Sequence, residues 1–427
     1  MTGGRPSRAL IRALRGISGA PVALVGLIVA AACGRPAPAP SLAEEPELRV
    51  GLAVGRDSVA LGGDGELVLT EDGARPTPVG TIAAGTRWWV VPDTGGVRLV
   101  RPDGTRSPRL GRVIAVNLSE RRFVMVNGRR YRGRAAVYRD AVGVTAVNVV
   151  PLEGYVAGVI GHELGPRRPE EAEALLAQAI VSRTYALRNR GRWTTLGFDA
   201  QSDVRDQTYL GVAAETPAVW EAVRRTGGRV LRYRGELIDA YYHSTCGHRT
   251  VPAEDAFRTV GHRPYLRSVS DAAGGGRYYC QQSPRFRWRE EWDGTELRAI
   301  LSRTLAPRAD FAAGGMPRVR DVAVTRTTRS GRVSELRIAF ARGDVRVPGY
   351  EVRDVLRRPD RPLWSAAFQV QVTRSAGEVT RLVAAGAGSG HGVGMCQWGA
   401  IGRARAGQDH GRILGTYYPG TRVDRIY

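Results

Sequence analysis

Three short segments of the sequence carry side chains that could perform chemistry, and the first contains Glu163. This residue lies in the run Gly161-His-Glu-Leu-Gly-Pro166, directly after an apolar stretch with helical spacing. A carboxyl group held beside apolar side chains has a raised pKa, which suits a general acid. The alternative is a capping or solvent-exposed carboxylate. An HExxH zinc motif is excluded, because Pro166 occupies the position of its second histidine.

The second segment, Tyr241–Arg249, and a later cysteine combine imidazole and thiol groups. The ligand types of a zinc site are present in His243, Cys246, His248 and Cys280. A disulfide between Cys246 and Cys280 is the preferred alternative, because an exported chain would readily form one. A cysteine nucleophile paired with a histidine is a third alternative. Cys396 has no evident partner in the sequence and is expected to be a buried thiol.

The third segment runs from Gly388 to Ala400 and contains alternating glycines. Glycine allows positive φ angles and close approach of the backbone, so a tight turn is expected here. A phosphate-binding loop would need a lysine followed by serine or threonine, and neither is present. The turn presents His391, Gln397 and Trp398 either to a cleft or to the core, and the pattern alone leaves both alternatives open.

The N-terminal residues predict export from the cytoplasm. Four arginines precede an uncharged run from Gly16 to Gly34, and small residues follow its apolar centre. This is the arrangement of a signal peptide, which we assign to residues 1–33. Cys33 follows three alanines, as at a lipoprotein cleavage site, but Ala30 replaces the usual large aliphatic residue. Simple cleavage, lipidation of Cys33 and an uncleaved anchor remain alternatives, so attachment to the membrane through the N-terminus stays open.

The charge of the chain points to anionic surroundings. The sequence has 63 basic residues, all arginine, against 41 acidic residues, and its formal net charge is +22. Nucleic acid, lipid head groups and acidic cell-wall polymers all fit such a charge. Export argues against nucleic acid. Arginine-rich stretches such as 129–134 are interpreted as the solvated face of a sheet in preference to a specific polyanion site.

The elements that must position these residues indicate an α+β fold. A Pro/Ala-rich tether is expected at 34–47 and a β-rich region of short antiparallel strands at 48–140. Two helices are predicted, one from Pro151 to about 160 and one from Glu170 to about 190. Strands at 229–233 and 236–242, a helix at 295–304 and a hairpin turn at 330–332 follow. We expect residues 141–427 to form the mixed α/β domain that contains all three segments.

Together these segments resemble the SpoIID/LytB family. The resemblance rests on five motifs in order: VPLEGYVAGVIGHELGP, EALLAQAIVSRTYAL, FDAQSDVRDQTYLGV, AYYHSTCGHRT and GHGVGMCQWGAIGRARAG. It implies that Glu163 is the catalytic residue. It also implies a substrate cleft lined by Gln178, Arg183, Tyr185, Gln201, Asp206, Gln207, Tyr209, His243, Ser244, His391 and Gln397.

The resemblance implies an extracytoplasmic protein that remodels peptidoglycan. Enzymatic members are lytic transglycosylases, which cleave glycan strands stripped of peptides and leave a 1,6-anhydro product. Attack by the sugar's own 6-hydroxyl makes a second catalytic carboxylate unnecessary, unlike in paired-carboxylate hydrolases. LytB-like members are instead non-catalytic enhancers of a cell-wall amidase, and this is the alternative function. No cofactor is required for either function, although zinc is an option at the cysteines.

The sequence departs from the family pattern at three places. Leu164-Gly165 stands where relatives usually have Met-Pro, Cys396 where serine is expected, and Trp398 where tyrosine is expected. These differences affect the expected shape of the cleft.

Overall fold

The structure is a computed structural model that describes residues 44–119, 121–305 and 316–427. The expected signal peptide, Cys33 and most of the expected tether lie outside the described residues. Within them, no helix has the length and apolar character needed to cross a bilayer.

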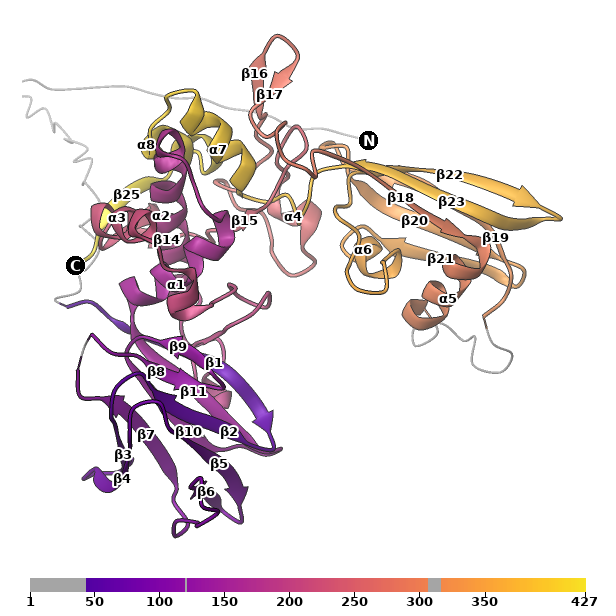
Figure 1. The fold of residues 1–427 in the computed structure, drawn as a ribbon. Coiled ribbons are helices and arrows are strands. Elements are labelled where there is room, and N and C mark those ends of the chain that lie inside the picture. Colours follow the sequence, from indigo (N-terminus) through magenta and orange to yellow (C-terminus); the bar gives the residue numbers. More distant parts are fainter. Residues whose placement is uncertain (1–43, 120, 306–315) are drawn as a thin grey trace, which may run out of the picture. The chain divides into compact units, whose positions relative to one another are not determined.

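A seven-stranded sheet dominates the N-terminal part, in the order β12-β1-β11-β10-β7-β3-β4 (Figure 1). Its strands are β1 (Glu47–Arg56), β3 (Leu67–Glu71), β4 (Thr77–Ile82), β7 (Arg112–Asn117), β10 (Arg134–Arg139), β11 (Val144–Pro151) and β12 (Ala200–Gln201). β11 is buried along almost its whole length, as expected of a central strand covered on both faces. It pairs antiparallel with β1 and β10 and runs directly into the first helix.

A second, five-stranded sheet has the order β6-β5-β2-β8-β9. Its strands are β2 (Val59–Gly63), β5 (Arg87–Asp93), β6 (Gly96–Val100), β8 (Val124–Val126) and β9 (Arg129–Tyr131). Both sheets contribute to one hydrophobic core, through side chains such as Leu61 and Val90 from this sheet and Leu69 and Val113 from the other. Short strands therefore occupy the region where the sequence predicts them.

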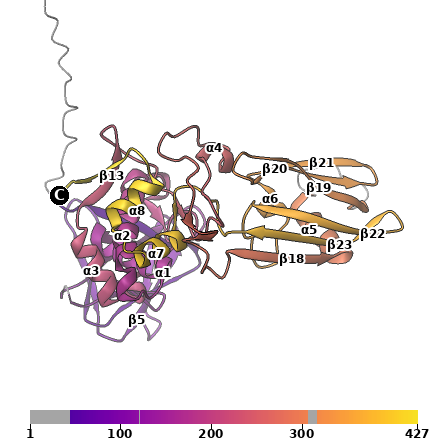
Figure 2. The ribbon, with the colours of Figure 1, turned by 90° about the horizontal axis from the view of Figure 1, so that it is seen from above.

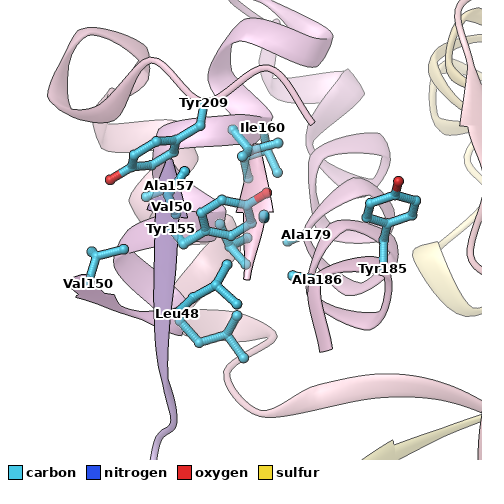
Figure 3. Close-up of a cluster of buried hydrophobic side chains, with 14 of the residues drawn as sticks. Leu48, Val50, Val150, Tyr155, Ala157, Ile160, Ala179, Tyr185, Ala186 and Tyr209 are labelled. Carbon is cyan, nitrogen blue, oxygen red and sulfur yellow. The ribbon is translucent and has the colours of Figure 1, made fainter. Parts of the chain in front are cut away.

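Helices α1 (Leu152–Leu164) and α2 (Ala172–Arg188) follow, close to the predicted helices. Pro151 precedes the first turn of α1, where a missing N–H costs nothing. α1 ends at Leu164 because Gly165 adopts a positive φ of 68° and Pro166 cannot continue the helix. Figure 3 shows Tyr155, Ala157 and Ile160 of α1 in a buried cluster with Leu48 and Val50 of β1 and Ala179 of α2.

The remaining elements of this part place the second and third segments side by side. β15 (Tyr242–His243) and β24 (Met395–Cys396) pair in parallel, and α7 (Gln397–Arg405) starts at the residue after β24. The sequence predicts one strand at 236–242, but the structure has two short strands there. β14 (Glu236–Leu237) pairs with β13 (Arg229–Tyr233), whereas β15 pairs with β24. The other elements are η1 (Pro169–Glu171), η2 (Thr194–Leu196), η3 (Gly211–Ala214), α3 (Pro217–Arg225), α4 (Ala253–Ala256), β16 (Ala272–Gly274), β17 (Arg277–Tyr278), α8 (His410–Tyr417) and β25 (Arg422–Arg425).

Residues 287–387 form two three-stranded sheets with a hydrophobic core of their own. The strands β18 (Arg287–Asp293), β23 (Glu378–Ala387) and β22 (Phe368–Ser375) run side by side in Figures 1 and 2. The other sheet contains β19 (Val319–Thr327), β20 (Val333–Phe340) and β21 (Gly343–Pro348), with the predicted turn at 330–332 between β19 and β20. Helices α5 (Gly294–Leu305) and α6 (Val352–Val355) add to this core. The segment 141–427 thus contains two separate cores.

Candidate active site

Glu163 lies in the last turn of α1 with its carboxyl group half-buried. Burial raises the pKa of this carboxyl above its ordinary value of 4.5, and hydrogen bonds with Gln397 and Tyr242 act in the opposite direction. The Gln397 side chain donates to Oε2 of Glu163 over 3.1 Å. A carboxyl group with a raised pKa keeps its proton at higher pH than a solvated one, so Glu163 has the property of a general acid.

A chain of hydrogen bonds holds Tyr242 against Glu163. The Tyr155 hydroxyl donates to Oε1 of Gln207 over 3.2 Å, and Nε2 of Gln207 donates to the Tyr242 hydroxyl over 3.1 Å. Tyr242 in turn forms a side-chain hydrogen bond with Glu163. The Tyr242 hydroxyl can accept from Gln207 and at the same time donate its own proton to the carboxylate of ionised Glu163. The network therefore favours the ionised form of Glu163 and partly opposes the effect of burial.

The pairing of β15 with β24 explains how Tyr242 and Gln397 reach the same carboxyl group. Tyr242 is opposite Met395, and His243 is opposite Cys396, so Gln397 starts α7 next to β15. The family resemblance implies a role for Gln397 but not for Tyr242. Alternation in the strand could have identified it, since the side chains of Tyr242 and the buried His243 must point to opposite faces.

Trp398, the residue after Gln397, presents a partly exposed aromatic ring near the start of α7. It follows Gln397 in α7 and is half-buried, and the Arg167 guanidinium lies 5.9 Å from the centre of its ring. The backbone N–H of Trp398 donates to the Ser244 carbonyl over 3.1 Å. An aromatic ring held in this way can pack against a sugar face or another apolar surface.

Three predicted substrate contacts are structural instead. Arg183 is fully buried, and its Nε donates to Glu153 of α1 over 2.9 Å. Tyr209 is also buried, with its hydroxyl donating to Asn148 over 2.7 Å and its ring stacked on Tyr155 at 5.1 Å (Figure 3). The buried Gln178 donates to Ser182 one turn further along α2 over 3.1 Å. Gln178, Arg183 and Tyr209, which were expected to line a cleft, are therefore buried in this structure and contact other protein groups.

A second group of predicted residues organises the loop after α2. The Asp206 carboxylate accepts from the Trp193 indole over 2.7 Å and from the Gln201 backbone N–H over 2.8 Å. The Tyr185 hydroxyl reaches the same carboxylate over 3.4 Å, and the Gln201 side chain accepts from Arg205 over 3.0 Å. Asp206 therefore fixes the loop that leads to Gln207. This is a supporting role for the hydrogen-bond network at Glu163.

The two histidines of the second and third segments lie close together and are neutral. The ring centroids of His243 and His391 are 5.6 Å apart. Burial lowers the pKa of His243 to about 3 and that of His391 well below its ordinary value. Nδ1 of His391 accepts from the Val393 N–H over 3.1 Å, which is a contact within its own glycine-rich turn. The Ser244 hydroxyl contacts Thr245 at 3.3 Å. The two segments are joined by His243, whose Nδ1 donates to the Val393 carbonyl over 3.1 Å.

The cysteines differ from the sequence expectation in two respects. The sulfur atoms of Cys246 and Cys280 are 3.6 Å apart, so the preferred disulfide is not formed, since a disulfide bond measures about 2.05 Å. The predicted zinc ligands are also regrouped. Cys246 and Cys280 lie with Cys396 and Asp271, whereas His243 and His248 are not part of this cluster. Cys396, expected to be without a partner, lies among the other thiols because β24 pairs with β15.

Comparison with known proteins gives the class of this chain. A family model described as SpoIID, stage II sporulation protein, matches residues 140–233, which include Glu163. A second model, described as a domain of unknown function (DUF8618), matches residues 275–394 and covers the part of the chain with a separate core.

Three relatives extend the similarity well beyond the matched domain. An uncharacterized protein of Brachyspira hyodysenteriae is 30% identical over 305 residues, which cover 70% of this chain and 73% of that protein. Stage II sporulation protein D of Bacillus subtilis is 26% identical over 302 residues, 67% of this chain and 78% of that protein. The amidase enhancer of Bacillus subtilis is 26% identical over 282 residues, 59% of this chain and 38% of that protein. The chain belongs to the SpoIID family.

Proposed function

We propose that this protein is a lytic transglycosylase that cleaves peptide-free peptidoglycan glycan strands outside the cytoplasm. The observation that carries the proposal is the carboxyl group of Glu163, whose pKa is raised by burial and whose position is fixed by Gln397 and Tyr242. Within the described residues, no hydrogen bond or ion pair joins Glu163 to a second carboxylate. Such a site suits a reaction that needs a single acid.

The reaction proceeds in two proton transfers at the same carboxyl group. Glu163 gives its proton to the glycosidic oxygen as the bond from that oxygen to the anomeric carbon of N-acetylmuramic acid breaks. The 6-hydroxyl oxygen of the same sugar then bonds to the anomeric carbon and closes the 1,6-anhydro ring. The hydroxyl proton passes to the Glu163 carboxylate and restores the acid, so no water is consumed. Because the nucleophile belongs to the substrate, a second enzyme carboxylate has no task.

Trp398 supports the choice of a sugar substrate. Its half-buried ring belongs to the residue after Gln397, whose side chain donates to the acid. Saccharide binding uses aromatic faces of this kind together with nearby charged or polar side chains, which Arg167 supplies here.

A second candidate function is the enhancement of a cell-wall amidase without catalysis. It is favoured by the relative named amidase enhancer, which is 26% identical over 282 residues. In that case the surface around Glu163 and Trp398 would bind glycan and bring an amidase partner to it. The two functions differ in whether the carboxyl group transfers a proton.

The Glu163→Gln variant distinguishes the two functions. Glutamine keeps the size of the side chain but cannot donate the proton, so release of 1,6-anhydro products from peptide-free glycan should fall by about 10²–10⁴-fold. The products are measured by mass spectrometry, and glycan binding is measured by pull-down of both proteins. Glu170→Gln is the matched control, because Glu170 is an exposed carboxylate paired only loosely with Arg168 at 3.9 Å. It should retain full turnover.

The other outcomes assign the function differently. Turnover that survives in Glu163→Gln would place the acid elsewhere. No turnover by the unaltered protein, with glycan binding retained, would support the enhancer function, and stimulation of an added amidase by both proteins would complete that assignment.

A further inference from the structure

Four buried side chains from three distant segments of the chain meet at one point. Their ligand atoms are the thiol sulfurs of Cys246, Cys280 and Cys396 and a carboxylate oxygen of Asp271, and all lie within 4.8 Å of one another. Each of the four residues is at most 1% exposed. A carboxylate buried among three thiols needs partners that offset its lost hydration, and a metal ion bound by all four groups would be one such partner.

The spacing of the sulfurs fits a shared metal ion better than a bond between them. The sulfurs of Cys246 and Cys280 are 3.6 Å apart. Two thiolates bound tetrahedrally to Zn²⁺ at about 2.3 Å lie about 3.8 Å from each other, whereas a disulfide brings sulfurs to about 2.05 Å. A disulfide between any two of the three cysteines would also leave the third thiol buried beside it.

Neighbouring N–H and hydroxyl groups form hydrogen bonds with the cysteine sulfurs and the carboxylate, as groups around metal ligands commonly do. The backbone N–H groups of Cys246 and Gly399 each donate to the Cys396 sulfur over 3.2 Å, the second of them in the first turn of α7. N–H donors and a helix N-terminus both stabilise a thiolate. The Asp271 carboxylate accepts from the Tyr417 hydroxyl over 2.7 Å and from the Cys280 backbone N–H over 3.0 Å. Contacts of this kind fix metal ligands in place.

The charges also balance. A Zn²⁺ ion with three thiolates and one carboxylate carries a net charge of −2, from +2 and −4. Arg403 supplies one compensating positive charge, with Nη2 lying 3.3 Å from Asp271. Arg332 supplies the second: it is 3% exposed and interacts electrostatically with Cys246 and Cys396. Its two terminal nitrogens have no hydrogen-bond partner within the described residues.

We propose that Cys246, Cys280, Cys396 and Asp271 form a structural Zn²⁺ site. Four protein ligands and complete burial are the features of a closed structural site, and thiolates select a soft divalent ion such as zinc. The ligand set replaces the one expected from the sequence, because His243 and His248 lie outside the cluster. The site joins three segments of the chain, at residue 246, at residues 271–280 and at residue 396. Since Gln397 follows Cys396, the metal also anchors the residue that donates to Glu163.

The test is the metal content of the full chain isolated after export, in a Cys33→Ser background so that only the three core cysteines are counted. We expect about one zinc per chain. The Cys396→Ser variant should lose at least tenfold in zinc occupancy at equal free Zn²⁺. His248→Ala is the matched control, because it removes a ligand of the sequence-predicted set, and it should keep its zinc.

A second measurement does not depend on the folding of any variant. The unaltered protein is stripped of metal under reducing conditions and titrated with Co²⁺, which reports thiolate ligands by strong charge-transfer absorption. We expect a tetrahedral thiolate spectrum that saturates at one Co²⁺ per chain and is displaced by Zn²⁺. Absence of this spectrum would overturn the proposal. So would zinc that is lost in His248→Ala but kept in Cys396→Ser, or a metal-free exported protein in which peptide mapping finds Cys246 bonded to Cys280. None of these readouts requires glycan turnover, so they stand apart from the test of the catalytic function.

Discussion

At the scale of single residues, the properties of Glu163 result from two opposing influences. Burial of the carboxyl group raises its pKa, and hydrogen bonds from Gln397 and Tyr242 lower it. The balance leaves the pKa above the ordinary value of 4.5. A reaction that needs the protonated acid should therefore lose rate as the pH rises through this pKa, and the position of that loss depends on each hydrogen bond.

Tyr242→Phe tests this balance. The change removes a hydrogen bond to the ionised form, worth about 1.5 kcal/mol, so the pKa of Glu163 should rise further by about one unit. The protonated acid then persists to higher pH, and the alkaline limb of the pH profile of kcat/KM should move up by about one pH unit. The profile is measured by anhydro-product release between acidic and mildly alkaline pH.

Tyr241→Phe is the control for the neighbouring tyrosine. The Tyr241 ring packs at 4.9 Å from that of Phe257, away from the carboxyl group, so this change should leave the limb in place. An unchanged limb in Tyr242→Phe, or one displaced to lower pH, would contradict the role assigned to the Tyr242 hydroxyl.

At the scale of elements, α1 depends on glycines that a helix would otherwise avoid. A Cβ atom at Gly161 would lie 1.8 Å from the carbonyl oxygen of Ala214, and one at Gly158 would lie 2.4 Å from the Tyr209 ring. Glycine within a helix costs about 1 kcal/mol relative to alanine. Because these two glycines have no side chain, the segment 207–214 can pack directly on α1. This packing places Gln207 in the hydrogen-bond network at Glu163.

Gly161→Ala should therefore destabilise the protein although alanine is the better helix former. The added methyl group meets backbone that cannot easily move, and overpacking of this kind costs about 1–3 kcal/mol. Gly415→Ala in α8 is the matched control, since its Cβ would have no atom within 4 Å, and it should stabilise by up to about 1 kcal/mol. Urea denaturation gives both free energies of unfolding. Equal stabilisation by the two changes would disprove the close packing of α1.

At the scale of the whole molecule, the N-terminal sequence and the net charge of +22 suit a protein that works among anionic cell-wall polymers. Glycan strands lie outside the cytoplasm, so the proposed function requires that residues after the predicted signal peptide cross the membrane. The chain offers an apolar run with four upstream arginines for this purpose.

A fusion of alkaline phosphatase after residue 60 should consequently be active, because this enzyme folds only outside the cytoplasm. A fusion that lacks residues 1–33 should be inactive and serves as the control. In the same strain, Cys33→Ser should abolish incorporation of labelled palmitate if the chain is a lipoprotein, without changing export. An inactive phosphatase alongside an active cytoplasmic reporter would place the protein inside the cell and exclude the proposed substrate.

The sequence by itself determined the local features of this protein. Apolar spacing and Pro151 predicted α1, and the glycine and proline residues within 161–166 predicted that it stops in that segment, because helix initiation and termination depend on neighbouring residues. Glu163 stood out as a candidate acid for the same local reasons and through the resemblance to the SpoIID/LytB family. The turn at 330–332 and the short strands of the N-terminal region were visible for similar reasons.

Only the tertiary structure decided which residues meet. Gln397 reaches Glu163 across a sequence separation of 234 residues, and Cys396 reaches Cys246 across 150. Both contacts follow from the parallel pairing of two-residue strands, which are too short to leave a periodic signal. The structure likewise shows that Arg183 is buried and forms an ion pair with Glu153. The sequence motif could not show this, because it gives the type of a residue but not the surface that remains exposed after folding.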